Sequence, residues 1–205
     1  MNPSIQTLIE TRVSTQHYDT QRPLSEAQVS LLVDLATRAP SAYNFQNWRF
    51  IAVRSAEAKA RLNAVSYGQQ QVLDAPVTYI ICGKLAAYKG LPSALMPSVV
   101  AGLLDQSTFD GWVAMAQRSH QDSPTLQRDE AMRSASLAAM TLMLAAQGMG
   151  LSTGAMSGFD PEGVTAAFDL SATELPVILV TVGYATTGHR LQKPRRPVHE
   201  VMTLA

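Results

Sequence analysis

The sequence lacks a second cysteine and an excess of charge of either sign. Cys82 is the only cysteine among 205 residues, so no internal disulfide forms. Its position in an apolar run indicates a buried strand residue and argues against a catalytic thiol. Sixteen basic residues balance sixteen acidic ones, so the net charge is zero. No global field therefore favours nucleic acid or an anionic membrane as a partner.

Signals for export, membrane insertion and metal binding are also missing. The N-terminus has neither the charged start nor the apolar run of a secretory signal, which predicts a cytoplasmic protein. The most apolar stretch, residues 137–146, falls well short of the ~20 residues that cross a bilayer. The histidines at 17, 120, 189 and 199 show no ligand spacing, so we expect no metal.

The common nucleotide-binding motifs are absent as well. The sequence contains no G-x-G-x-x-G after a strand and no G-x-x-x-x-G-K-[ST]. This argues against a Rossmann dehydrogenase and a P-loop enzyme. No pair of carboxylates stands out for acid–base work. If the chain is an enzyme, we expect the reactive atoms to belong to a bound cofactor.

Hydrophobic periodicity divides the chain into elements of one domain, which we expect to span residues 1–205. Ser25 and Gln28 have the spacing of a capping box and open a helix that should stop before Pro40. The path of residues 84–125 stays open, because prolines and glycines interrupt two weakly helical stretches. Helices are expected over about 4–13, 25–39, 55–62, 126–147 and 161–168, and strands over 48–53, 77–82 and 175–182.

The helix over residues 126–147 carries an unusually apolar half. Between Leu137 and Ala146 only Thr141 is polar, so we expect this helix to be buried on every side. A domain of this size has few elements with which to cover such a helix. We therefore expect a second subunit to cover it, which makes the protein a homodimer.

A loop dense in hydrogen-bonding side chains, residues 39–48, lies between a predicted helix and a predicted strand. Ser41, Asn44 and Gln46 stand on this anchored connection, and their donors and acceptors suit the edge of a planar heterocycle. The alternative is a turn whose Ser and Asn side chains bond to their own backbone. From this segment alone the two interpretations are about equally supported.

Two basic clusters near the ends of the chain suggest a single phosphate site. Arg12 and Ser14 form the first, and Lys193, Arg195 and Arg196 form the second. Arginine binds phosphate oxygens in a bidentate manner, and a serine hydroxyl adds a neutral donor. The alternative, more common for an isolated basic run, is a solvated tail. A nucleic-acid patch is weakly supported, because no aromatic residues are interleaved.

Segments spread over nearly the whole chain resemble, in order, the landmarks of the nitroreductase family of FMN-dependent oxidoreductases. These segments are residues 12–18, 39–48, 148–160, 175–184 and 193–197. Each is weakly specific alone, but their order and spacing are typical of the family. The resemblance implies an α+β fold with a central mixed, mainly antiparallel sheet flanked by helices. It also implies an intertwined homodimer with FMN at the subunit interface.

The resemblance further implies which residues bind the cofactor. The phosphate or ribityl chain would be held near both termini, by Arg12, Val13, Ser14, Gln16, Lys193 and Arg195. The other subunit would contact the flavin through Pro40, Ser41, Ala42, Asn44 and Gln46. The isoalloxazine would lie beside Ser157 and Gly158, where a backbone N–H reaches N5, and its pyrimidine edge beside Gln69 and Gln71.

Family members take a hydride from NADH or NADPH and pass electrons to nitroaromatic, quinone or related acceptors in a ping-pong cycle. The resemblance thus implies no catalytic side chain, because flavin N5 carries the chemistry, while stacking and orientation supply most of the catalysis. Aromatic residues are candidates to line the substrate slot, although core packing is the common alternative for each. These candidates are Tyr43, Phe45, Tyr67, Phe109 and Trp112.

Three residues depart from the family pattern. Gln16 and Gln71 stand where relatives often have Arg or Lys, and Asn47 replaces the proline of a common Q-P-W. A cation at the pyrimidine edge would stabilise reduced FMN by on the order of 1–4 kcal/mol. Because Gln16 and Gln71 are neutral, we expect this flavin to be harder to reduce. Two other functions stay open: a flavin- or ligand-binding protein with little turnover, and a dedicated flavin-dependent oxidase or dehalogenase of one metabolite.

Overall fold

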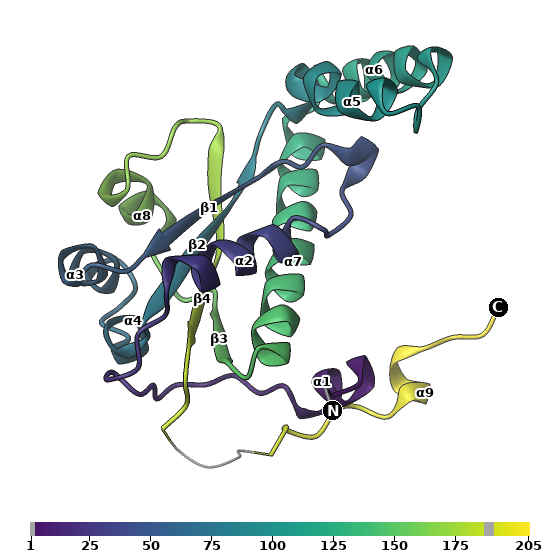
Figure 1. Ribbon diagram of the computed structural model, residues 1–205. Helices are drawn as coiled ribbons and strands as arrows, with labels where there is room; N and C mark the ends of the chain where they lie inside the picture. Colours follow the sequence, from purple (N-terminus) through teal and green to yellow (C-terminus); the bar gives the residue numbers. More distant parts are fainter. Residues whose placement is uncertain (1–2, 187–190) are drawn as a thin grey trace.

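A four-stranded sheet forms the centre of the protein in the computed structural model, which describes residues 3–186 and 191–205 (Figure 1). Its strand order is β1-β2-β4-β3, and each neighbouring pair is antiparallel. An isolated bridge between Ser14 and Thr153 adds a parallel contact. The strands are β1 (Trp48–Val53), β2 (Val77–Lys84), β3 (Ser152–Met156) and β4 (Glu174–Gly183).

The expected strands are confirmed, and β3 is the one that the sequence interpretation missed. Strand β2 lies inside the sheet and is buried along all but its last residue, as its continuous apolar run indicates. Residues 152–156, in contrast, are Ser, Thr, Gly, Ala and Met, of which only Thr is β-branched and none is aromatic, so the usual strand signal is weak. Their pairing with β4 places them in the sheet.

Helices cover both faces of this sheet (Figure 1). The helices expected from periodicity are present with small changes of boundary, and the Asp160 side chain caps the N-terminus of α8. The helices are α1 (Ile5–Thr11), α2 (Glu26–Ala36), α3 (Ala56–Ala64), α4 (Gln70–Asp74), α5 (Leu91–Val100), α6 (Gln106–His120), α7 (Pro124–Gly148), α8 (Pro161–Ala167) and α9 (Val198–Val201), with 3₁₀ turns η1 (Ala42–Asn44) and η2 (Ala87–Gly90).

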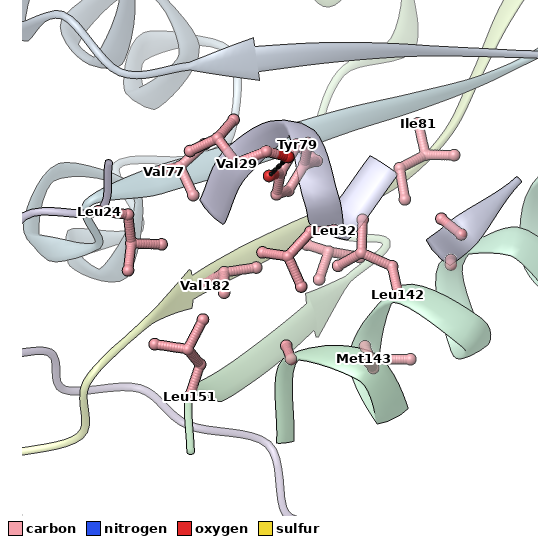
Figure 2. Packing of buried hydrophobic residues seen from close by; sticks show 14 of the residues in the cluster. Leu24, Val29, Leu32, Val77, Tyr79, Ile81, Leu142, Met143, Leu151 and Val182 are labelled. Carbon is pink, nitrogen blue, oxygen red and sulfur yellow. Dashed lines mark hydrogen bonds between the residues drawn. The ribbon is translucent and has the colours of Figure 1, made fainter. Parts of the chain in front are cut away.

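One face of the sheet is covered by α2 and α7 (Figure 2). The Ser25–Gln28 capping box that opens α2 is present in full. Val29 and Leu32 of α2 meet alternate residues of β2, and the Tyr79 hydroxyl donates a hydrogen bond of 2.9 Å to the Val29 carbonyl. Because strand side chains alternate between faces, the remaining residues of β2 face the other side.

The opposite face packs against α3, α4 and α8 through Leu62, Val72 and Val164. Cys82 belongs to this cluster and is fully buried. Burial raises the pKa of its thiol to about 12, which leaves no thiolate at neutral pH. The expectation of a structural cysteine is thus confirmed.

Helix α7 packs on the sheet along one side only. Gly83 of β2 permits this contact, because a Cβ atom there would overlap the Ala131 carbonyl. On the opposite side Leu137 is 46% exposed and Met140 is 37% exposed. In a single chain this helix is therefore not buried on every side, and the predicted burial would need the second subunit. The reason is that α1, α2 and the sheet cover only part of its circumference, which leaves an apolar stripe on its surface.

Residues 84–125, whose path the sequence left open, form η2 and the helix pair α5–α6. This pair stands at the N-terminal end of α7, away from the sheet (Figure 1). It has its own apolar cluster, in which Tyr88, Leu91, Leu95 and Phe109 surround Phe45 from the loop before β1. The helix pair is therefore attached to the body partly through that loop.

Candidate functional site

The two ends of the chain meet in a pocket of about 230 Å³. Arg12 follows directly after α1, and the C-terminal segment runs alongside it. The Gln192 amide joins the two by donating to the carbonyl oxygens of Ile9, at 3.2 Å, and Arg12, at 3.0 Å. The pocket is lined by Arg12, Val13, Ser14, Gln16, Leu191, Gln192, Lys193 and Arg195.

Backbone pairing with β3 places the N-terminal half of this pocket. The Thr15 N–H donates to the Thr153 carbonyl at 2.8 Å, next to the bridge between Ser14 and Thr153. Gly154 makes this approach possible, since a Cβ atom there would overlap the Thr15 carbonyl oxygen. The buried Tyr18 hydroxyl lies 2.8 Å from Thr181 Oγ1 and ties the same segment to β4.

The pocket has the donor set of an anion site. Arg12 is half-buried, Lys193 and Arg195 are exposed, and none of the described residues that line the pocket is acidic. Arg195 Nη1 also donates to the Lys193 carbonyl at 2.7 Å, which ties this side chain to its own segment. Guanidinium groups and a serine hydroxyl in one pocket suit a phosphate. Arg196 is exposed and does not line the pocket.

A second hollow of about 230 Å³ continues from the first. Gln16 lines both hollows, and the second is completed by His17, Gln69, Gln70 and Gln71. The glutamine amides are fixed in a chain that leads to β3. The Gln71 amide donates to Gln69 Oε1 at 3.1 Å, and the Gln69 amide donates to the Gly158 carbonyl at 2.7 Å.

This chain of amides brings the expected flavin-edge residues together. The Gln71 amide also contacts the Met156 sulfur at the end of β3. Ser157 and Gly158 follow Met156 directly and are exposed. The residues expected at the phosphate, at the pyrimidine edge and beside N5 thus lie along one face, between the chain termini and the end of β3.

The loop before β1 lies elsewhere in the same chain. It sits at the N-terminal end of α7, whereas α1 and the C-terminal segment lie at the opposite end (Figure 1). An α-helix rises 1.5 Å per residue, so the 25 residues of α7 span about 37 Å. Within one chain, therefore, this loop is not brought to the pocket. The loop residues concerned are Pro40, Ser41, Ala42, Asn44 and Gln46.

Three residues of this loop have a strained backbone conformation. Tyr43, Asn44 and Gln46 have φ of 51°, 59° and 48°, a left-handed region that costs non-glycine residues energy. The Ser41 hydroxyl accepts a 2.9 Å hydrogen bond from the Gln46 N–H, as the turn interpretation predicts. The Asn44 and Gln46 side chains remain exposed, as the ligand interpretation requires. Such strain is common at ligand-contacting sites.

Four of the five aromatic candidates gather between this loop and the α5–α6 pair. Tyr43 lies 5.4 Å from Phe45 and 6.3 Å from Trp112 between ring centroids, and Phe109 belongs to the same cluster. Phe45 and Phe109 are buried, while Tyr43 and Trp112 are half-buried. Tyr67 is separate: it is 73% exposed on the turn between α3 and α4.

The sequence interpretation missed some residues near these sites. Leu191 and Gln192 line the terminal pocket, and the only available signal was their position just before Lys193. His120 was considered only as a metal ligand, yet it lies in the aromatic cluster, with ring centroids 5.1 Å from Phe45 and 6.3 Å from Tyr43. Its helical spacing from Ala116 and Phe109 was the missed sign of burial.

Two of the sequence predictions concern a metal site and a membrane-spanning helix. In residues 3–186 and 191–205, no three His, Cys, Asp or Glu side chains come together in a way that could hold a metal ion. His189, one of the histidines considered, lies outside these described residues. No helix in the same ranges has the length and apolar character needed to cross a membrane.

Comparisons of the sequence with known proteins agree on one family. The model of the Nitroreductase family matches residues 9–184. YodC, a candidate NAD(P)H nitroreductase of Bacillus subtilis (strain 168), is 36% identical over 199 residues, which cover 96% of each chain. MhqN, another candidate NAD(P)H nitroreductase of that organism, is 28% identical over 195 residues, which cover 94% of this chain and 95% of MhqN.

Solved structures share the fold over nearly the full length. A candidate nitroreductase from Exiguobacterium sibiricum 255-15, solved in complex with FMN, superposes with a TM-score of 0.91 at 26% identity and covers 99% of this chain and 98% of that one. The candidate nitroreductase ydfN from Bacillus subtilis gives a TM-score of 0.90 at 27% identity, with 98% of both chains covered.

Proposed function

Because the chain belongs to the nitroreductase family, we propose that it binds FMN between two identical subunits and passes electrons from NAD(P)H to nitroaromatic or quinone-type acceptors. The relatives named as NAD(P)H nitroreductases support this activity, and the FMN-bound structure supports the cofactor. When bound, FMN would supply the hydride and electron transfer. No side chain is then required as a nucleophile or a general acid.

The groove that joins the terminal pocket to the glutamine amides is the observation that carries the proposal. It has cationic and hydroxyl donors at one end and amides, which both donate and accept, at the other. A phosphate fits the first end, and the heteroatom edge of a flavin fits the second. The described residues therefore suit FMN in both charge and order along the groove.

The chain's own residues would bind and orient the ligands. Arg12, with Lys193 and Arg195, would hold the phosphate, and the amides of Gln69 and Gln71 would orient the pyrimidine edge. Ser157 and Gly158, exposed after β3, would leave a backbone N–H free to approach N5. Val13, Ser14 and Gln16 would line the groove between these two ends.

A second subunit would complete the site. Pro40, Ser41, Ala42, Asn44 and Gln46 lie too far along α7 to reach the groove of their own chain. The apolar stripe of α7 supports association, because an exposed apolar helix face favours burial against another. The tail residues Val198, Val201 and Leu204 are exposed apolar side chains as well. The partner's loop, with the α5–α6 pair behind it, would then cover the flavin and exclude water from the slot.

An absorption spectrum and a steady-state assay test the proposal together. The purified protein should show flavin bands near ~450 nm and should release FMN, identified by mass, on denaturation. It should oxidise NADH or NADPH only when a quinone or nitrofuran is supplied, with parallel double-reciprocal plots typical of a ping-pong cycle. Yellow protein without turnover would instead favour a flavin-binding function, and protein that binds no flavin would contradict the proposal.

A further inference from the structure

His120, the last residue of α6, is a buried histidine that none of the roles above uses. It is 5% exposed and lies at the corner between α6 and α7. Its Nδ1 atom is 2.8 Å from Ser119 Oγ and 3.1 Å from the Ala116 carbonyl oxygen. Its Nε2 atom is buried and has no hydrogen-bond partner among the described residues.

These contacts determine which nitrogen carries the proton. The Ala116 carbonyl oxygen only accepts, so the short contact requires Nδ1 to donate. The Ser119 hydroxyl has an acceptor of its own in the Met115 carbonyl, at 2.9 Å, and is therefore free to accept from Nδ1 as well. If Ser119 donated to Nδ1 instead, Nδ1 and the Ala116 oxygen would face each other as two acceptors. With its proton on Nδ1, the imidazole has its acceptor atom at Nε2.

Aromatic rings enclose this acceptor atom. The ring of Phe45 stands edge-on to His120, with centroids 5.1 Å apart and planes at 84°. The Tyr43 ring lies 6.3 Å away at 76°, and that of Tyr88 lies 6.5 Å away. A phenylalanine at position 120 would fill a similar space without leaving a buried acceptor unpaired. Because buried acceptors are rarely left unpaired, Nε2 needs a donor from outside the chain, either a water molecule or a ligand.

The enclosure has one side on which such a donor can arrive. Phe45, Tyr88 and His120 are buried, whereas Tyr43 and Trp112 are half-buried and 6.3 Å apart between centroids. Tyr43 is the half-buried ring that contacts His120 directly. A ligand that reaches the imidazole from this side would have to displace the Tyr43 ring. The left-handed backbone at Tyr43 agrees with a ligand-contacting position.

We propose that Nε2 of His120 accepts a hydrogen bond from an aromatic ligand that enters beside Tyr43. The ligand class is a planar aromatic ring with an N–H donor, of which an aromatic carboxamide is the simplest example. His120 would thereby favour carboxamides over compounds of the same shape without a donor. This inference rests on the proposed function, because the ligand is one that this reductase takes into its slot.

Histidine side-chain ¹⁵N NMR on the full-length, FMN-loaded protein tests the hydrogen bond without turnover. The ligands are 4-nitrobenzamide, which has N–H donors, and methyl 4-nitrobenzoate, which has a similar shape and none. Without ligand, His120 should show an unprotonated Nε2 resonance, assigned by its loss in His120→Phe. The amide should shift this resonance and the ester should not. Equal changes with both ligands, or no change with either, would overturn the inference.

Steady-state kinetics give a second measurement through the ratio of kcat/KM for the amide to that for the ester. Loss of one neutral hydrogen bond should lower this ratio about fivefold in His120→Phe, the equivalent of about 1 kcal/mol. The ratio cancels any general loss of activity in the variant. An unchanged ratio would contradict the inference. If the wild-type protein reduces neither compound, the proposed function fails instead, and the NMR titration still decides the role of His120.

Discussion

Replacing Arg12 with alanine should weaken FMN binding more than any other single change among the cations of the terminal pocket. Arg12 is half-buried between α1 and the C-terminal segment, whereas Lys193 and Arg195 are exposed. Two unit charges ~4 Å apart attract by about 1 kcal/mol in water and about 4 kcal/mol near a protein surface of lower dielectric. For the half-buried guanidinium of Arg12 we expect an attraction to the phosphate between these limits, at about 2 kcal/mol.

The expected change in affinity follows directly. About 2 kcal/mol corresponds to about a 30-fold rise in the Kd for FMN in Arg12→Ala. An exposed cation lies near the lower limit, so Arg195→Ala should raise the Kd only about fivefold. Added salt should shrink the effect of Arg195→Ala more than that of Arg12→Ala, because exposed charges are screened more strongly.

Fluorescence titration of the apo-protein with FMN measures these constants. Riboflavin, which lacks the phosphate, is the matched ligand control and should bind wild type and Arg12→Ala equally. Arg38→Ala is the matched protein control, because Arg38 is an exposed arginine just beyond the C-terminal end of α2, paired with Asp34 at 3.4 Å. Equal losses of FMN and riboflavin affinity in Arg12→Ala would refute a phosphate contact, as would an equal loss in Arg38→Ala.

Three further changes test other parts of the structure. Gln71→Lys should raise the midpoint potential of bound FMN by about 20–90 mV in a spectroelectrochemical titration, because a cation at the pyrimidine edge is worth about 1–4 kcal/mol; an unchanged potential would mean that Gln71 does not contact the flavin. Leu137→Glu should convert a dimer to a monomer in sedimentation, since it places a charge on the apolar stripe of α7; an undisturbed dimer would locate the interface elsewhere. Burial raises the pKa of Glu174, but hydrogen bonds from Arg49, at 2.7 Å, and from the Ser171 N–H outweigh it and hold the pKa below its usual range. The resulting stabilisation is fully present above about pH 4.3 and is lost as the pH falls through the lowered pKa. Glu174→Gln should therefore lower the free energy of unfolding in urea by about 1 kcal/mol at pH 7 and by little in acid. An equal loss at both pH values would contradict this reasoning.

Short-range patterns in the sequence predicted much of the fold. The capping box at Ser25 and Gln28 forms as expected, because both of its hydrogen bonds join residues three positions apart. Strand β2 was recognisable because burial on both faces requires a continuous apolar run. The basic clusters near both termini suggested that Arg12 and Arg195 share a site, the resemblance to a family implied the same, and the structure brings both residues to one pocket.

Other parts depended on contacts that no local pattern records. Strand β3 has little strand propensity and is held by pairing with β4 and by the close approach of Thr15 to Gly154. The α5–α6 pair contains prolines that obscure its periodicity, and it is held by the insertion of Phe45 between Tyr88 and Phe109. In both cases the stabilising partner is far away in the sequence.

The sequence by itself determined where most of the helices and strands form and which side chains are available to bind an anion or a planar ring. Its local hydrogen bonds and apolar spacing act over a few residues, so they are visible without the fold. Only the tertiary structure decided that the loop of Ser41 lies at the opposite end of α7 from Arg12, and that one face of this helix is left uncovered. It also decided that His120 faces an aromatic enclosure with an unpaired nitrogen. These features arise from packing between distant segments, where the shape of each surface and the loss of water settle which groups meet.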